Sequence, residues 1–233
     1  MNSDETGKIS LLDHGFVRLV DFMGTDLSVV RAARVSYDAA WRAGEDTGSD
    51  KRLIGYLWRN KHMTPFEAVE FQFEVKAPIF VLRQWHRHRT WSFNELSARY
   101  RELPEEFYVP RPEMIGTQSS SNKQMREIGD MTKEEMRAAK TSAGMMKLAG
   151  EGAFSIYRDL IARGVPRELA RSVLPTSTYS HMFAKTNLRN LLAFCDLRDH
   201  SHAQHEIRVY AQAMIASVRE VVPVCIEAWE AGR

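Results

Sequence analysis

The chain has 233 residues, of which 44% are hydrophobic, so it is long enough to form a packed globular core. Its 32 basic and 30 acidic residues leave a net charge of +2, too small to indicate a polyanion partner by itself. No apolar run is long enough to cross a bilayer, and the polar start, MNSDETGKIS, lacks a signal-peptide core.

Cysteine usage and length give two further expectations. Cys195 and Cys225 are the only cysteines, and both lie in apolar stretches without a second cysteine at metal-binding spacing. We therefore expect a reduced, cytoplasmic chain with no membrane contact. The absence of an internal repeat leads us to expect one domain over 1–233.

The first third of the chain alternates between strand and helix patterns. FVRLVDFMG predicts a strand, and DLSVVRAARVSY after it predicts a helix that Thr25 or Asp26 would cap. A second helix is expected over 50–60. VEFQFEVKAP is the clearest strand, because every second residue is apolar. The apolar positions are Val69, Phe71, Phe73 and Val75.

A helix is expected next, through IFVLRQWHRHR, with Pro78 in its first turn. At about 100° per residue, its polar face carries Gln84, Arg87 and His88. The opposite side carries Leu82, Trp85 and Arg89. Guanidinium forks suit phosphates and planar carbonyl edges, so the polar face fits a phosphorylated ligand with a flat ring. The alternative is a surface helix end whose arginines pair with Glu95 and its neighbours.

MIGTQSSSNKQ is the only low-complexity segment, and we expect a polar, mobile loop at about 116–126. The sequence assigns no role to 119–123 within it. Thr132 and Glu135 then form a capping-box pattern that predicts the start of a long helix. Gly164, followed by a proline, predicts its end.

The C-terminal part is expected to be mostly helical. Asn187 fits a helix N-cap, and Ser201 with Gln204 predicts a helix from about His202 to Glu220. Early strands followed by late helices indicate an α+β fold. We expect a central, mostly antiparallel sheet flanked by helices, with a largely helical C-terminal half.

Three histidines, at 200, 202 and 205, raise the possibility of a metal-dependent hydrolase. His202, His205 and Glu206 would share one helical face, a spacing that can bind zinc. The pattern lacks the histidine pair with an intervening glutamate that zinc proteases carry. Structural or capping histidines are favoured, and we expect no metal.

The chain has neither a glycine-rich phosphate loop nor a Gly-x-Ser-x-Gly elbow. A nucleotide or flavin would therefore be bound by side chains. A second alternative is a protein that binds single-stranded nucleic acid, since arginines and aromatic residues interleave in RHRTWSFNELSAR.

RHRTWSFNELSAR also carries a family signature, RHR-x2-S-x-NE-x-S-x-R, between Arg87 and Arg99. In this signature the chain resembles the flavin-dependent thymidylate synthases. The resemblance extends to TPFE, VKAPIFVLRQW, GVPRELARSVLP and DLRDHSHAQHEI, and so covers nearly the whole chain. The fixed positions are Arg87, His88, Arg89, Ser92, Asn94, Glu95, Ser97 and Arg99.

The resemblance implies reductive methylation of dUMP to dTMP. The carbon would come from 5,10-methylenetetrahydrofolate and the electrons from NADPH through bound FAD, with the protein supplying position and electrostatics. It also implies a homotetramer whose sites are shared between subunits, and small-molecule substrates with no nucleic acid partner.

The resemblance assigns site residues position by position. Flavin-binding positions match Thr64, Arg87, His88, Arg89, Glu95, Asn187, Leu188 and Arg189. Positions around dUMP match Gln84, Arg87, Glu95, Leu96, Ser97, Arg99, Arg171 and Arg198. His62 matches a histidine near the flavin and the folate face. Ala193 is a departure, because an asparagine that contacts the flavin often stands there.

Arg198 is the expected catalytic residue. It matches an arginine proposed to bind the uracil edge and to favour ionisation at N3, and a cation there would stabilise negative charge on the ring. The motif regions hold no cysteine, so we expect activation without an enzyme cysteine nucleophile. Ser97 is expected to contact the nucleotide, because a serine nucleophile would need a neighbouring base.

Overall fold

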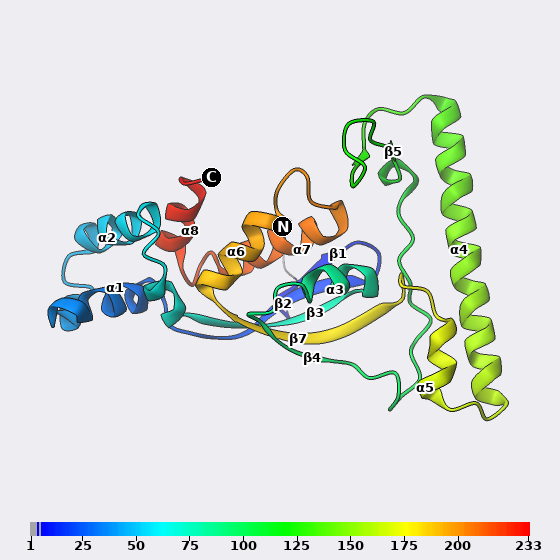
Figure 1. Cartoon of the computed structure of the whole chain (residues 1–233), viewed down its shortest axis with the longest axis horizontal. Helices are drawn as coiled ribbons and strands as arrows, with labels where there is room; N and C mark the ends of the chain where they lie inside the picture. Colours follow the sequence, from blue (N-terminus) through cyan, green and yellow to red (C-terminus); the bar gives the residue numbers. More distant parts are fainter. Residues whose placement is uncertain (1–3, 5) are drawn as a thin grey trace.

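A five-stranded antiparallel sheet forms the centre of the computed structural model, which describes residue 4 and residues 6–233 (Figure 1). The strands lie in the order β1-β2-β3-β7-β4, and every neighbouring pair is antiparallel. Their bounds are β1 Lys8–Leu11, β2 Gly15–Met23, β3 Glu70–Pro78, β4 Ser92–Glu95 and β7 Tyr179–Asn187. The expected α+β class with a mostly antiparallel sheet is confirmed.

The central strand β3 has the predicted alternation. Phe71, Phe73 and Val75 are at most 1% exposed and face the main core. The first strand prediction is also confirmed, as β2. Its mixed pattern arises from a register shift between Leu19 and Asp21, a bulge that changes the direction of the side chains beyond it.

Helices α3, α6 and α7 pack on the sheet, while α1, α2 and α8 group at one end of it (Figure 1). Both early helix predictions are confirmed. The bounds are α1 Asp26–Arg34, α2 Thr47–Arg59, α3 Ile79–Trp85, α6 Leu188–Arg198, α7 His205–Val218 and α8 Pro223–Glu230. Short 3-10 helices are η1 Val35–Tyr37, η2 Ala40–Arg42, η3 Thr64–Ala68, η4 Pro112–Met114 and η5 Arg171–Val173. None of the helices within the described residues is long and apolar enough to cross a membrane.

Helix α3 ends earlier than predicted, at Trp85, and Arg87–Arg89 follow it in a turn. Pro78 is its N-cap residue rather than part of the first turn. At this end of α3 the Gln84 carbonyl accepts hydrogen bonds from the Arg87 N–H and from the Arg198 guanidinium. An i to i+3 bond tightens the chain into a 3-10 turn and ends the helix.

The long predicted helix is α4, Lys133–Ala162, with Thr132 as N-cap in a complete capping box with Glu135. Gly164 follows it with a φ of +83°, as the stop signal predicted. Helix α4 lies beside the sheet body, together with α5, Arg167–Ala170 (Figure 1). A second, smaller hydrophobic cluster under α4 is built on Phe154, Tyr157 and Ala170.

The expectation of a loop at about 116–126 was wrong in part, because this segment contains paired strands. β5, Thr117–Gln118, pairs with β6, Arg126–Glu127, to form a small ribbon. Ser119 is 8% exposed, and its hydroxyl accepts hydrogen bonds from two backbone N–H groups of the turn. Its mobility stays a prediction.

The last long helix begins later than predicted. The expected start at His202 was wrong, because α7 begins at His205 with Gln204 as its N-cap residue. The segment 199–203 instead forms a turn that connects α6 to α7. Consequently His202 does not lie on the α7 face that carries His205 and Glu206.

Candidate functional site

Three residues expected around the ligands meet where α3 ends and α6 ends. The Arg198 Nε donates to His88 Nε2 at 3.0 Å, and another Arg198 nitrogen donates to the Gln84 carbonyl at 3.2 Å. The Gln84 side-chain amide donates to the Gln204 amide oxygen at 2.6 Å. The His88 ring packs edge-on against Phe194, which fixes its orientation.

The charges at this junction are not balanced. Burial and the nearby Arg198 charge lower the pKa of His88 to about 4, so its imidazole is neutral at pH 7 and accepts from Arg198. Burial also lowers the pKa of Arg198, which means that the protein penalises its charge. Arg198 is therefore a partly buried cation whose hydrogen-bond partners are neutral.

The neighbouring carboxylates are bound elsewhere. Asp196 accepts the Trp229 indole N–H at 2.7 Å, and Asp199 pairs with Arg233 at 2.8 Å. A cavity of about 540 Å³ opens beside Arg198 and runs along the α6–α7 turn. Its polar lining residues are Gln84, Gln124, Asp196, Arg198, His200, His202 and Gln204, and the one carboxylate among them, Asp196, is the acceptor of the Trp229 indole N–H. This space and its cation fit an anionic or electron-rich ligand.

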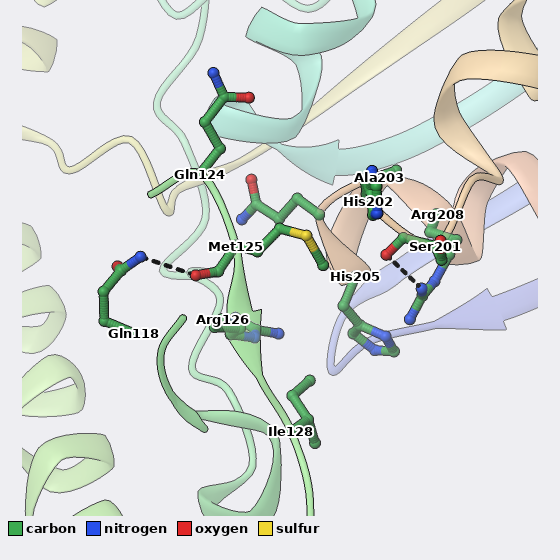
Figure 2. Close-up of a pocket in the computed structure, with 11 residues that line it drawn as sticks. Gln118, Gln124, Met125, Arg126, Ile128, Ser201, His202, Ala203, His205 and Arg208 are labelled. Carbon is green, nitrogen blue, oxygen red and sulfur yellow. Dashed lines mark hydrogen bonds between the residues drawn. The ribbon is translucent and has the colours of Figure 1, made fainter. Parts of the chain in front are cut away.

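A second cavity, of about 420 Å³, adjoins the first and is drawn in Figure 2. It lies between the β5–β6 ribbon and the start of α7. Gln124, His202, Ala203 and Gln204 line both cavities. Arg126 and Arg208 add guanidinium groups to the second one. No carboxylate is among the lining residues of this second cavity.

The second half of the signature lies on β4 and the turn after it. Pairing of β4 with β7 places Glu95 opposite Met182, and Glu95 accepts a hydrogen bond from the Ser180 hydroxyl at 2.6 Å. His86 Nε2 lies 3.8 Å from the same carboxylate. The Leu96 N–H continues the pairing to the His181 carbonyl. Glu95 is thus held from two sides, as a residue that positions a ligand would need.

Four arginines of the predicted sites, Arg87, Arg89, Arg99 and Arg171, are exposed, and none pairs with a carboxylate in the described part of the chain. Nine other arginines do form such pairs. Guanidinium groups without a carboxylate partner are available for phosphates. Arg87 and Arg89 flank His88 in the sequence, so two such guanidinium groups lie just after the end of α3.

Further predicted flavin residues lie at the other end of α6. Asn187 caps this helix and accepts the Asn190 N–H at 3.0 Å, as predicted. Arg189 pairs with Glu67 beside Thr64. The 11 residues of α6 separate this group from Arg198 by about 15 Å, so the two groups do not form one pocket within one chain.

The Leu188 side chain is fully buried in the main core, so a flavin can meet only its backbone. Ala193 is exposed on α6 and Asn190 is partly buried, one helical turn away.

His62 and Arg171 lie away from the Arg198 cavity in this chain. His62 is exposed and packs edge-on against Tyr56 at 5.8 Å between ring centroids. Arg171 belongs to η5, which contacts α4 and α5. The structure therefore brings Gln84, His88 and Arg198 together and leaves these two residues apart.

The cysteines and the histidine cluster do not build a reactive centre. Cys195 and Cys225 are both 0% exposed, and burial raises the pKa of each thiol. No group of three or more possible metal ligands occurs within residues 4 and 6–233 where the structure describes them.

Two residues of the site lie outside the predicted set. Gln204 binds Gln84, and Gln124 reaches the Arg198 cavity from the β5–β6 ribbon. A signal for Gln204 was present, since it lies six residues after Arg198 in a stretch that the resemblance covers. Gln124 had none, because only tertiary packing brings the ribbon to α6.

The chain is similar to known proteins in both sequence and structure. A family model described as thymidylate synthase complementing protein matches residues 18–224. A flavin-dependent thymidylate synthase from Thermus thermophilus is 47% identical, covering 95% of this chain and 78% of that one. One from Rickettsia bellii is 44% identical over the same shares. The crystal structure of PolB from Streptomyces cacaoi, a UMP/dUMP methylase bound with 5-Br dUMP, has a TM-score of 0.84 and 41% identity, covering 96% of this chain and 97% of that one.

Proposed function

The chain belongs to the family of flavin-dependent thymidylate synthases, and from this premise we propose that it methylates dUMP to dTMP. We further propose 5,10-methylenetetrahydrofolate as the carbon donor, NADPH as the reductant and FAD as the bound flavin. The relatives carry this activity in their names, and the similar PolB structure holds a brominated dUMP.

One observation carries the proposal: Arg198 is a partly buried cation without a carboxylate partner, in a cavity large enough for a nucleotide base. Its guanidinium would lie against the uracil edge. Attack at the uracil ring places negative charge on the ring, and a fixed cation stabilises that charge without reorganising. The neutral His88 ring and the Gln84 carbonyl hold the guanidinium in place.

The residues around the nucleotide would divide the work by their chemistry. Arg87, Arg99 and Arg171 supply guanidinium forks for the phosphate, and Glu95 accepts hydrogen bonds from the sugar or base. Ser97 contributes a hydroxyl, and no neighbouring base binds it within the described residues. The complete proposed set for dUMP is Gln84, Arg87, Glu95, Leu96, Ser97, Arg99, Arg171 and Arg198.

The flavin would be held by side chains rather than by a glycine loop. When bound, it supplies the reducing electrons for the new methyl group. Arg87 and Arg89 bind its phosphates, His88 presents its ring, which Arg198 and Phe194 hold in place, and His62 closes the folate side. The complete proposed set is Thr64, Arg87, His88, Arg89, Glu95, Asn187, Leu188 and Arg189.

A cysteine nucleophile has no place in this proposal. Both thiols are fully buried with raised pKa values, and the thiolate is the reactive form of cysteine. Arg198 would instead activate the uracil ring electrostatically.

A homotetramer with shared sites would bring the separated groups together. Arg171 and the N-terminal end of α6 lie away from Arg198 within one chain, although all are proposed to meet the same ligands. Helix α4 also exposes Met145, Leu148 and Ile156, which are 54% to 69% exposed. Exposed apolar rows of this kind favour contact with another subunit.

The test is a spectrum followed by an assay. Purified protein should absorb as a flavoprotein, and NADPH oxidation in the presence of methylenetetrahydrofolate should depend on dUMP. A colourless protein whose binding to RNA falls steeply with salt would support the nucleic acid alternative. Stoichiometric zinc and loss of activity with a chelator would support the hydrolase alternative.

A further inference from the structure

The β5–β6 ribbon reaches the Arg198 cavity but has few bonds to the rest of the molecule. Gln124 lines the cavity beside Arg198, and Met125 lines the adjoining one (Figure 2). Most hydrogen bonds of the ribbon are internal, such as those from the Gln118 amide to the carbonyls of Lys123 and Met125. Across the residues that the structure describes, one side chain alone bonds the ribbon to the sheet body, and that side chain is Arg126.

The partner of Arg126 is Glu206, in the first turn of α7. Their nitrogen and oxygen lie 2.7 Å apart, and Glu206 is only 1% exposed. The Tyr108 hydroxyl donates to the same carboxylate oxygen at 2.9 Å. Burial alone would raise the pKa of Glu206, but the hydrogen bonds and charge of Arg126 outweigh it and hold that pKa low. The carboxylate is therefore charged at neutral pH and binds Arg126.

We propose that Glu206 is a positioning residue for the nucleotide cavity: through Arg126 it holds the β5–β6 ribbon against α7, so that Gln124 forms a wall beside Arg198. The proposal rests on the proposed function for its nucleotide, whereas the ion pair and its effect on the ribbon stand independently. Breaking a buried ion pair by removing one partner leaves a buried charge, so the ribbon has a strong reason to stay docked while both are present.

Substrate binding and ribbon docking should then favour each other. A nucleotide that contacts Gln124 binds only the docked ribbon, and its affinity falls when the docked fraction falls. Loss of the ion pair should therefore raise the KM for dUMP and leave kcat nearly unchanged, because Arg198 and its own partners remain in place. A general loss of structure would lower kcat and the melting temperature instead.

Limited proteolysis tests the docking without any activity. Lys123 is exposed in the ribbon turn, and endoproteinase Lys-C cuts after lysine. In Glu206→Gln, we expect cleavage after Lys123 to be about 5- to 10-fold faster than in the unaltered protein, because cleavage follows the open population. Glu230→Gln is the control: it breaks the ion pair between Arg219, the C-cap residue of α7, and Glu230 on α8, far from the ribbon (Figure 1), and should leave the rate unchanged. Equal rates in Glu206→Gln and the unaltered protein would overturn the proposal.

A second experiment measures the kinetics of ribbon variants and leaves the buried Glu206 unaltered. Arg126→Met should raise the KM for dUMP roughly tenfold with kcat within about twofold, and Arg126→Lys should restore part of it. Gln124→Ala should raise the KM for dUMP to the same extent. The double variant with Arg126→Met should have a KM only slightly higher than that of either single variant. Additive effects of the two changes, or an unchanged KM, would overturn the role of Arg126. Faster Lys-C cleavage in Glu206→Gln still supports the docking if dUMP proves not to be the substrate.

Discussion

Arg198 concentrates the chemistry of the proposed site in one side chain. It donates to a neutral imidazole and a carbonyl, and it keeps its charge for the ligand. The signature around Arg87 and the position of Arg198 could be read from the sequence. Their contact could not, because residues 88 and 198 are joined only by the packing of α3 against α6.

Substitution of Arg198 separates charge from geometry. Arg198→Met removes the cation and should lower kcat about 10²- to 10³-fold, as expected for the loss of one preorganised electrostatic contact. Arg198→Lys keeps the charge but loses the guanidinium fork that binds His88 and Gln84. Its kcat should therefore lie between that of Arg198→Met and that of the unaltered protein. Steady-state kinetics with saturating dUMP measure this. A fully active Arg198→Met would remove the residue from the mechanism.

The neutral state of His88 predicts a pH dependence of stability. Its folded pKa of about 4 lies below the unfolded value near 6.5, so the unfolded chain binds more protons between these pH values. The contribution of His88 to the free energy of unfolding is therefore full above pH 6.5 and is lost as the pH falls toward 4. Urea unfolding at several pH values should show that the free energy of unfolding falls less between pH 6.5 and pH 4 in His88→Asn than in the unaltered protein. If the free energy of unfolding fell equally with pH in both proteins, the pKa of His88 would not be depressed.

Among the helices and strands, sequence patterns correctly predicted those elements that depend on neighbouring residues. The alternation of β3 and the capping box of α4 are both present as expected. β4 and β7 were not predicted, because their pairing is long-range and their sequences are mixed. α3 ends early in a turn where its Gln84 carbonyl accepts from the Arg87 N–H and also from Arg198, a partner more than a hundred residues later that local patterns do not show.

Two glycines of α4 test how this helix is attached. A Cβ at Gly150 would lie 2.3 Å from the Phe107 ring, whereas one at Gly152 would meet nothing within 4 Å. Gly150→Ala should destabilise the protein by about 1–3 kcal/mol through overpacking. Gly152→Ala should stabilise it by up to about 1 kcal/mol through helix propensity. Urea unfolding measures both, and equal effects would contradict the observed facing of α4.

At the scale of the whole molecule, one chain does not assemble the site that the sequence predicts. Arg171 lies beside α4, and Asn187 lies at the far end of α6 from Arg198. The sequence could indicate which residues serve the ligands, but it could not show that one copy separates them. Shared sites in a homotetramer would resolve this separation.

Mixing inactive variants tests the sharing. Arg171→Met and Arg198→Met should each be nearly inactive alone. If each site takes these two arginines from different subunits, mixed tetramers contain some sites with both, and co-expression should restore up to about a quarter of the activity. Activity of co-purified, differently tagged subunits measures it. No recovery in verified mixed tetramers would place both arginines of a site in one subunit.

Transfer of the methylene carbon to dUMP can be followed with a label. The flavin-loaded protein is incubated with dUMP, NADPH and methylenetetrahydrofolate labelled with ¹⁴C at the methylene carbon, and the nucleotide is separated by chromatography. We predict label in dTMP, dependent on both dUMP and NADPH and strongly reduced in Arg198→Met. Unlabelled nucleotide from a protein that binds flavin and dUMP would contradict methylation of dUMP by this protein.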